Sequence, residues 1–246
     1  MTDAMIPIDT PTQGAPPDAR IYRHRLPTRV WHWINAVSVI VMIGSGLMIF
    51  NAHPRLYWGD FGANLDAAWL ELPRFPGWVT IPERYDLALG RRWHLFFALV
   101  LAFNLAGFMI VGLVNGHFRR DLRIRFAELR PAHLWHDVQE HWAFRFHDPA
   151  QPGAFNILQK IAYCSAIFVL LPLVILTGLT LSPGMDAAWP WLLDVFGGRQ
   201  SARSLHFIAM GAIAGFVIVH LALVILAGPV NEVRSMVTGR WRVPHG

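Results

Sequence analysis

The chain has 246 residues and a formal net charge of +5; 54% of the residues are hydrophobic, 13% aromatic and only 15% charged. This composition is typical of an integral membrane protein and excludes an ordinary soluble domain. The positive charge is nearly all arginine and flanks apolar segments, as topology signals do, so it does not indicate nucleic-acid binding. The single cysteine, Cys164, excludes a disulfide framework, a covalent CxxCH attachment and a cysteine-ligated cluster.

The chain begins with a polar stretch. Residues 1–20 are rich in Pro, Asp and Thr and lack the apolar core of a signal peptide, so we expect a disordered cytoplasmic tail. The first apolar segment, 30–50, follows four arginines, which predicts that it starts on the cytoplasmic side. It carries His32 in its first turn, and Gly44 and Gly46 leave a smooth groove for a helix or a cofactor.

Two long connections flank the second apolar segment. The loop 51–91 is too polar to span a membrane and is predicted to fold as a cap on the outer surface. The segment 93–114 returns to the cytoplasm and carries His94 near its outer end. The loop 115–159 is the most basic connection, in agreement with this orientation. Within it, residues 131–146 have the apolar spacing of an amphipathic helix at the membrane interface.

The third apolar segment, 161–181, contains Pro172, which a membrane helix tolerates where neighbouring groups bond the freed carbonyl. The fourth, 203–227, is followed by a predicted cytoplasmic tail, 229–246. We therefore predict an all-α integral membrane protein, a four-helix transmembrane bundle spanning residues 21–228 with two long interfacial loops. Its predicted location is the bacterial inner membrane, which it crosses several times with both termini in the cytoplasm.

The fourth segment carries two histidines, His206 and His220, on nearly the same helix face. Fourteen residues correspond to about 1400° of helical rotation, some 40° short of four full turns, and to about 21 Å along the axis. An imidazole in hydrocarbon is costly and usually faces the bundle interior with a partner. The direction of each segment predicts two pairs at matching depth, which are His32 with His220 and His94 with His206.

Bis-histidine ligation of a haem iron needs two opposed imidazoles on facing helices, and a four-helix bundle offers that geometry. A lone histidine at a helix end is more often an interfacial or core residue, but four that pair by depth are harder to explain in that way. Zinc is an alternative, yet it usually takes four protein ligands, or three plus water. The pattern therefore favours two non-covalent b-type haems with these four histidines as metal ligands.

A family resemblance rests on four stretches, TRVWHWINAVSVIVMIGSGL, RRWHLFFALV, PGAFNILQKIAY and SLHFIAMGAIAGFVIVHLALVILAG. They resemble the bacterial cytochrome b family that includes the membrane subunits of nickel–iron hydrogenases, formate dehydrogenase and thiosulfate reductase. The resemblance covers roughly half of the chain and implies two b-type haems with quinone-linked electron transfer. It places the ligand positions on the same four histidines. By analogy, the partner would be a separate molybdenum, tungsten or nickel–iron oxidoreductase subunit.

Arginines near the ends of the segments are candidates for binding haem propionates, which are anions. The candidates for the inner haem are Arg25 and Arg29, and those for the outer haem are Arg91, Arg92 and Arg203. Topology and contact with lipid headgroups explain these arginines equally well.

Two roles are possible for each of three amide side chains. Asn104, in the middle of the second segment, either donates across helices or binds a quinone. Asn156 and Gln159, at the start of the third segment, either cap that helix or line a cytoplasmic quinone pocket.

The predicted function is that of a membrane di-haem b-type cytochrome. It would transfer electrons between the quinone pool and a partner oxidoreductase subunit in a respiratory chain, surrounded by membrane lipid. Two alternatives stay open: a self-contained superoxide:quinone oxidoreductase of the same fold, and a haem-free anchor or transporter whose histidines relay protons. The sequence has no glycine-rich phosphate motif and no Ser-His-Asp pattern that would indicate a separate catalytic domain.

Overall fold

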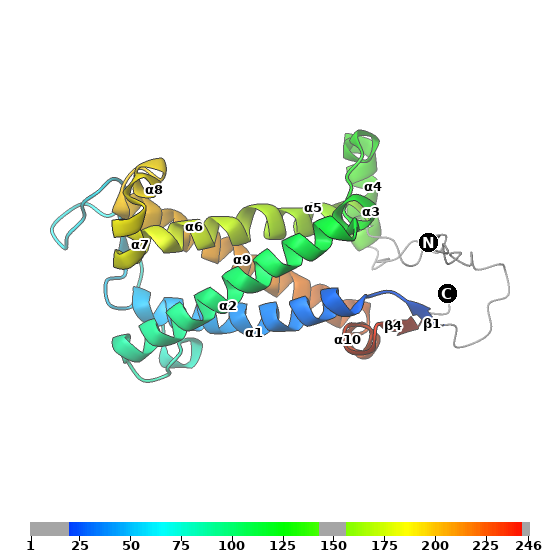
Figure 1. Cartoon of the computed structure of the whole chain (residues 1–246), viewed down its shortest axis with the longest axis horizontal. Helices are drawn as coiled ribbons and strands as arrows, with labels where there is room; N and C mark the ends of the chain where they lie inside the picture. The colour runs from blue at the N-terminus through cyan, green and yellow to red at the C-terminus, as the bar shows by residue number, and fades with distance from the viewer. Residues whose placement is uncertain (1–19, 143–155, 243–246) are drawn as a thin grey trace.

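The computed structural model describes residues 20–142 and 156–242. Four helices in these two ranges are long and apolar enough to cross a membrane. They are α1 (Leu26–Phe50), α2 (Leu87–Val114), a composite helix that comprises α5 (Ile157–Ser165), a π-helical turn (Ala166–Leu170) and α6 (Leu171–Leu181), and α9 (Arg199–Ala227). All four run between the same two ends of an elongated molecule (Figure 1). The predicted all-α transmembrane bundle is confirmed.

The long helices pack most closely in two pairs, α1 with α2 and α6 with α9. Apolar side chains from both pairs form one core, including Val39, Leu105, Phe108, Leu171 and Ile213. Large apolar side chains on the outward faces are exposed along the spans, among them Ile40, Phe103 and Ile218. Water would make such a surface costly, whereas lipid tails are as apolar as the side chains.

The helices α1 and α2 begin earlier than the apolar segments that start at residues 30 and 93. In α1 a proline occupies the first turn, where its missing N–H costs no hydrogen bond. In α2 the side chain of Asp86 caps the helix by accepting from the backbone N–H of Leu89 at 2.9 Å. Each helix thus begins with a polar first turn, which the length of its apolar segment does not include.

The third membrane helix contains a π-helical turn directly before Pro172. Proline lacks a backbone N–H, and its ring collides with the carbonyl four residues earlier. A π turn changes the local hydrogen-bond spacing and is a common way to accommodate such a misfit. The helix therefore continues past its proline to Leu181.

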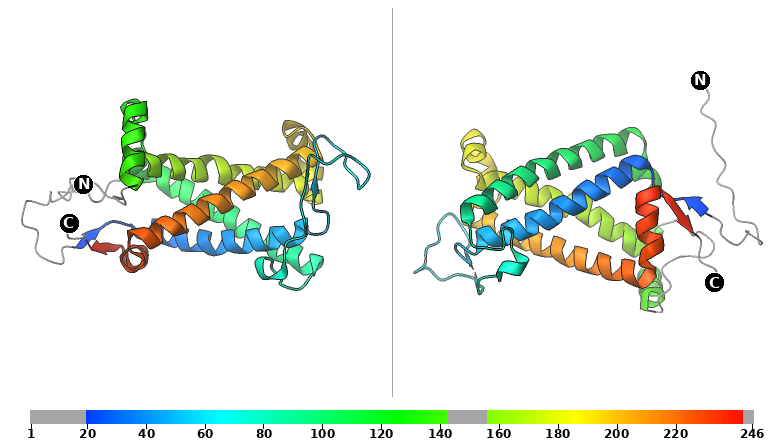
Figure 2. Two further views of the ribbon diagram at one scale, coloured as in Figure 1. Left: turned by 180° about the vertical axis from the view of Figure 1, so that it is seen from behind. Right: turned by 90° about the horizontal axis from the view of Figure 1, so that it is seen from below.

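Strands from both ends of the described chain meet at one end of the bundle, which we call the terminal end. The strand β1 (Arg20–Tyr22) pairs antiparallel with β4 (Arg240–Arg242), which follows the helix α10 (Pro229–Thr238) (Figures 1 and 2). The predicted tails at 1–20 and 229–246 therefore include folded residues, from Arg20 at one side and through Arg242 at the other. Residues 1–19 and 243–246 lie outside the described residues.

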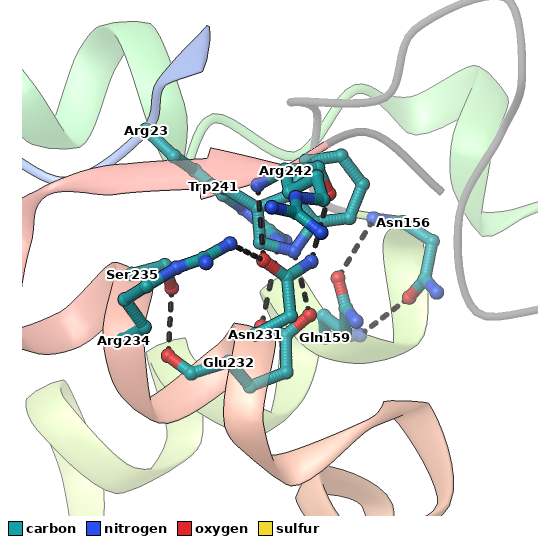
Figure 3. Close-up of polar contacts among 9 residues, drawn as sticks. All are labelled: Arg23, Asn156, Gln159, Asn231, Glu232, Arg234, Ser235, Trp241 and Arg242. Carbon is teal, nitrogen blue, oxygen red and sulfur yellow. Dashed lines mark hydrogen bonds and ion pairs between the residues drawn. The ribbon is translucent and has the colours of Figure 1, made fainter. Parts of the chain in front are cut away.

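A group of three side chains, which we call the terminal clasp, holds these segments together (Figure 3). Arg23 lies 3.5 Å from the carboxylate of Glu232, with the two side chains only 7% and 17% exposed. The indole N–H of Trp241 donates to the same carboxylate at 2.8 Å, and Trp241 is fully buried. The guanidinium of Arg23 also lies over the Trp241 ring, 5.1 Å from its centre.

The basic connection folds at the terminal end as well. It contains α3 (His117–Asp121), a 3-10 turn (Phe126–Leu129) and α4 (Pro131–Trp142) (Figure 1). The helix α4 agrees with the interfacial helix predicted within 131–146, of which residues 143–146 lie outside the described residues.

The opposite end, which we call the cap end, is covered by the connection that follows α1 and by two short helices. The elements are the paired strands β2 (Arg55–Leu56) and β3 (Leu70–Glu71), a 3-10 turn (Gly77–Val79), α7 (Pro183–Ala188) and α8 (Pro190–Val195). The loop between β2 and β3 reaches beyond the ends of the helices in every view (Figures 1 and 2). Backbone amides of Gln200 and Ser201 at the start of α9 donate to the carbonyl of Gly59, at 2.9 and 3.1 Å. The predicted folded cap is thus fastened to the first turn of α9.

Candidate functional site

The four histidines of the membrane helices meet in two pairs. His32 on α1 faces His220 on α9 with ring centres 6.3 Å apart and ring planes at 61°. His94 on α2 faces His206 on α9 with ring centres 6.2 Å apart and ring planes at 63°. The first pair lies toward the terminal end and the second toward the cap end. Because α9 is one continuous helix, the pairs are separated by about 21 Å along its axis.

The separation within each pair fits a metal ion held between the rings. An imidazole nitrogen binds a transition metal at about 2 Å and lies about 1 Å from the ring centre, so two opposed rings on one metal are about 6 Å apart. Both pairs have this spacing. The described part of the chain contains no group of three or more His, Cys, Asp or Glu that could hold a metal. A zinc site with three or four protein ligands is therefore absent from that part.

Hydroxyl groups fix both histidines of the cap-end pair. The Nδ1 atom of His94 lies 3.0 Å from the hydroxyl of Ser45 on α1. The Nδ1 atom of His206 lies 3.0 Å from the hydroxyl of Thr177 on α6. Each hydroxyl also donates to the carbonyl one turn earlier in its own helix, at 2.6 Å in both cases. With its proton used there, each oxygen accepts from Nδ1–H, which leaves Nε2 deprotonated and able to bind a metal.

A glycine next to each hydroxyl residue gives the imidazole room. A Cβ atom placed on Gly46 would lie 3.3 Å from Cε1 of His94. A Cβ atom placed on Gly178 would lie 3.2 Å from Cε1 of His206. Both distances are shorter than ordinary contacts, so any larger residue would press on the ring. The groove predicted at Gly46 accordingly receives His94, whereas Gly44 packs against Ile81 of the cap connection.

The terminal-end pair has a different environment. The Nδ1 atom of His32 is buried and has no hydrogen-bond partner within residues 20–142 and 156–242. The edge of its ring meets Trp33, with ring centres 5.2 Å apart. His220 stacks on Phe216 with centres 5.9 Å apart and planes at 7°. The terminal-end pair therefore lacks the hydroxyl contacts that the structure gives to His94 and His206.

Two of the five predicted propionate arginines, Arg29 and Arg203, donate to backbone carbonyls of the protein. Arg29 donates to the carbonyl of Val237, while its Nε atom is buried without a partner in the described part of the chain. Arg203 donates to two cap carbonyls, at 3.0 Å to Arg55 and also to His53. The other three candidates are exposed: Arg25, Arg91 and Arg92. Propionate binding by any of these arginines stays a prediction.

The amide side chains make structural contacts. The Asn104 side chain donates across helices to the carbonyl of Trp31 at 3.2 Å. Asn156 and Gln159 form a reciprocal cap at the start of α5, with each side chain accepting from the other residue's backbone N–H (Figure 3). These contacts account for all three residues, and their predicted roles at a quinone stay predictions.

Sequence reasoning missed Ser45, Thr177 and Gly178. A signal for them was present, because each imidazole of the cap-end pair lies against a hydroxyl residue followed by glycine, Ser45-Gly46 or Thr177-Gly178. Neither dipeptide is unusual in an apolar helix. The sequence therefore does not show that these residues contact a histidine unless it is also known which residues lie at the same depth in the bundle.

Comparisons with known proteins agree with this geometry. The family model described as prokaryotic cytochrome b561 matches residues 23–239. A relative from Azospira oryzae, named as the protein-methionine-sulfoxide reductase subunit YedZ1, is 30% identical over 80% of this chain and 87% of its own length. One from Azotobacter vinelandii, named as a Ni/Fe-hydrogenase B-type cytochrome subunit, is 26% identical over 91% and 88%. The Escherichia coli cytochrome YdhU is 26% identical over 91% and 75%.

No solved structure matches the chain. The family match nevertheless spans the four membrane helices and both histidine pairs, and it implies a haem of the b type. The residues fit such a group, because each pair offers two opposed imidazoles at the spacing that one metal requires. The chain is a multi-pass membrane b-type cytochrome that belongs to the prokaryotic cytochrome b561 family.

Proposed function

We propose that this chain binds two b-type haems and transfers electrons between a quinone and an oxidoreductase subunit outside the membrane. One haem would be held by His32 and His220, and the other by His94 and His206. When bound, each haem supplies a carrier for one electron at a time. The chain supplies the axial ligands, an apolar surrounding that excludes water, and a fixed spacing between the two sites.

The observation that carries the proposal is the matched spacing of two imidazole pairs on one helix. Both pairs have ring centres just over 6 Å apart although their ligands come from three different helices. Proton relay by histidines requires no such duplication of geometry. A haem-free anchor would also have little reason to keep four imidazoles inside the membrane, where polar groups are costly.

The distribution of arginines supports an orientation with the terminal end in the cytoplasm. Arg119 and Arg120 on α3, and Arg130 before α4, lie at the end where β1 and β4 meet. Short basic connections stay on the cytoplasmic side of bacterial inner membranes. The cap end would then face the outside of the inner membrane.

The tip of the cap supports the docking of an outer partner protein. Phe61 is 90% exposed and Leu65 is fully exposed, and both belong to the loop between β2 and β3, which projects past the helices (Figure 2). The loop is ordered by its own hydrogen bonds, such as that from the Tyr57 hydroxyl to the Ala63 carbonyl at 2.8 Å. Two large apolar side chains exposed on the same loop support a protein contact there. The relatives' names associate them with a hydrogenase or a protein-methionine-sulfoxide reductase, which supports an oxidoreductase as the partner. We propose a partner of the nickel–iron, molybdenum or tungsten class.

A quinone would exchange electrons at the terminal end. A quinol releases two protons on oxidation, so its site needs access to water, which the terminal end has. The amides of Asn156 and Gln159 lie at this end and are the candidates for contact with a quinone head group.

Optical spectroscopy of the purified full-length chain tests the proposal. We expect reduced b-type bands and two non-covalent haems per chain, together with reduction of both haems by an added quinol. An absence of haem, or one haem per chain, would contradict the di-haem proposal.

The same preparation separates the proposed relay from the self-contained enzyme. A relay without its partner oxidoreductase should not couple superoxide oxidation to quinone reduction. Steady quinone reduction by superoxide, in the absence of any other protein, would favour the self-contained oxidoreductase instead.

A further inference from the structure

The two histidine pairs differ in the contacts that their Nδ1 atoms make. Both cap-end histidines, His94 and His206, direct Nδ1 at a hydroxyl oxygen 3.0 Å away. At the terminal end, Nδ1 of His32 has no partner among the described residues. The hydroxyls belong to Ser45 and Thr177, which are both fully buried.

The protons of these contacts can be assigned from the hydrogen-bond geometry. The Ser45 hydroxyl is 2.6 Å from the carbonyl of Val41, and the only proton of the hydroxyl is needed there. The Thr177 hydroxyl stands in the same relation to the carbonyl of Leu173, also at 2.6 Å. Each oxygen is therefore an acceptor that is polarised by its own donated bond. The Nδ1–H of each imidazole can donate to this oxygen, and a backbone carbonyl, that of Met42 for His94 and that of Val174 for His206, is a further acceptor for the same ring.

A ligand histidine that donates from its second nitrogen becomes a more basic ligand. A more basic ligand stabilises the oxidised, more positive iron more than the reduced iron. Since this argument depends on haem binding between His94 and His206, it rests on the proposed function. We propose that Ser45 and Thr177 are positioning residues that orient the two cap-end ligands and selectively lower the reduction potential of that haem.

The chain provides matched controls. Ser38 lies on the same helix as Ser45, is equally buried, and donates to the carbonyl of Ile34 at 2.8 Å, but it contacts no histidine. Thr180 is likewise buried beside Thr177 and donates to the carbonyl of Thr177 at 2.7 Å. Substitution of Ser38 or Thr180 therefore measures the cost of losing a buried hydroxyl without losing a ligand contact.

The test is a redox titration of the full-length chain, followed through the absorption of both haems, for Ser45→Ala, Thr177→Val and Thr177→Ser. We expect Ser45→Ala and Thr177→Val each to raise the potential of one haem and to leave the other unchanged. If each contact favours the oxidised iron about tenfold, the rise is about 59 mV, since a tenfold change in a one-electron equilibrium corresponds to 59 mV. Thr177→Ser keeps the hydroxyl and should keep the wild-type potential.

Ser38→Ala and Thr180→Val should leave both potentials at their wild-type values. Unchanged potentials in Ser45→Ala and Thr177→Val, or equal shifts in these variants and in the controls, would overturn the proposal. Should Ser45→Ala lose the haem altogether, the Thr177→Val and Thr177→Ser pair still decides the question, because valine matches threonine in shape. A wild-type chain without haem would refute the proposed function itself. Bound haems whose potentials do not change in these variants would refute only the role proposed for the two hydroxyls.

Discussion

The two ends of the bundle present imidazole pairs of nearly the same spacing but hold them in different ways. At the cap end, neighbouring residues in the helices fix each ring, through Ser45 and Gly46 on one side and Thr177 and Gly178 on the other. At the terminal end, the ring of His32 meets Trp33 and that of His220 stacks on Phe216, and the clasp built from both ends of the described chain lies at this end of the bundle.

This difference shows that similar ligand spacing can rest on local or on remote contacts. A hydroxyl and a glycine next to each other on a helix act directly on the ring, so a change there should affect the ligand first. The terminal clasp joins Arg23 to Glu232 and Trp241 across nearly the whole chain, so a change there should affect folding of that end first. Four predictions test this contrast, beginning with the largest effect.

Removal of a ligand from each end is the strongest test. We expect His206→Ala to remove the cap-end haem and His220→Ala to remove the terminal-end haem, each with loss of about half of the b-type absorbance, because a bis-histidine site needs both ligands. Haem quantification of the purified variants gives the result. Loss of both haems from either variant, with the helices still folded, would show that the two sites are not independent.

Neutralising the partly buried carboxylate of Glu232 should loosen the terminal end. We expect Glu232→Gln to cost about 3 kcal/mol, because the Arg23 charge would remain in a site that is mostly shielded from water. The cap-end pair of Arg199 and Asp186, at 3.3 Å, is far more exposed, so Asp186→Asn should cost less than about 1 kcal/mol. Thermal unfolding in detergent compares the two variants, and equal costs would contradict the contrast.

Filling a glycine at the cap end should disturb a ligand without loosening the fold. Alanine at Gly46 would press on the His94 ring, so we expect Gly46→Ala to lower haem occupancy at the cap end or to alter its spectrum. Gly211→Ala is the control, because nothing lies within 4 Å of a Cβ at that position on α9. The control should be neutral or stabilising by up to about 1 kcal/mol, since alanine favours a helix over glycine. An unchanged haem spectrum in Gly46→Ala would mean that the ring has room to shift.

Acid should also weaken the terminal end. Burial, together with the nearby charge of Arg23, lowers the pKa of His24 from 6.5 to about 4. His24 therefore becomes protonated below about pH 6.5 in the unfolded chain but only near pH 4 in the folded chain. The free energy of unfolding falls as the pH drops from 6.5 to 4, and it does not change with this group above that range. Protease sensitivity of the β1–β4 region, followed between pH 7 and 4, should show this loss, and His24→Gln should flatten it.

Much of the bundle could be predicted from the sequence because two simple signals set it. Apolar length located the four spans, and the fourteen-residue interval between His206 and His220 put two imidazoles on one face. The ends of the helices could not be located in this way. The polar first turns of α1 and α2 are stabilised by a proline and by the Asp86 cap, and not by hydrophobicity.

The sequence by itself determined the four membrane helices and the pairing of the histidines by depth, because helical periodicity and bilayer thickness convert residue number into position. Only the tertiary structure decided which side chains contact each imidazole ring, how the cap is hydrogen-bonded to α9, and that β1 pairs with β4. Those contacts join residues far apart in the chain, such as Ser45 with His94, Gly59 with Ser201 and Arg23 with Glu232. They are selected by the packing of the helices, and no local pattern in the chain specifies them.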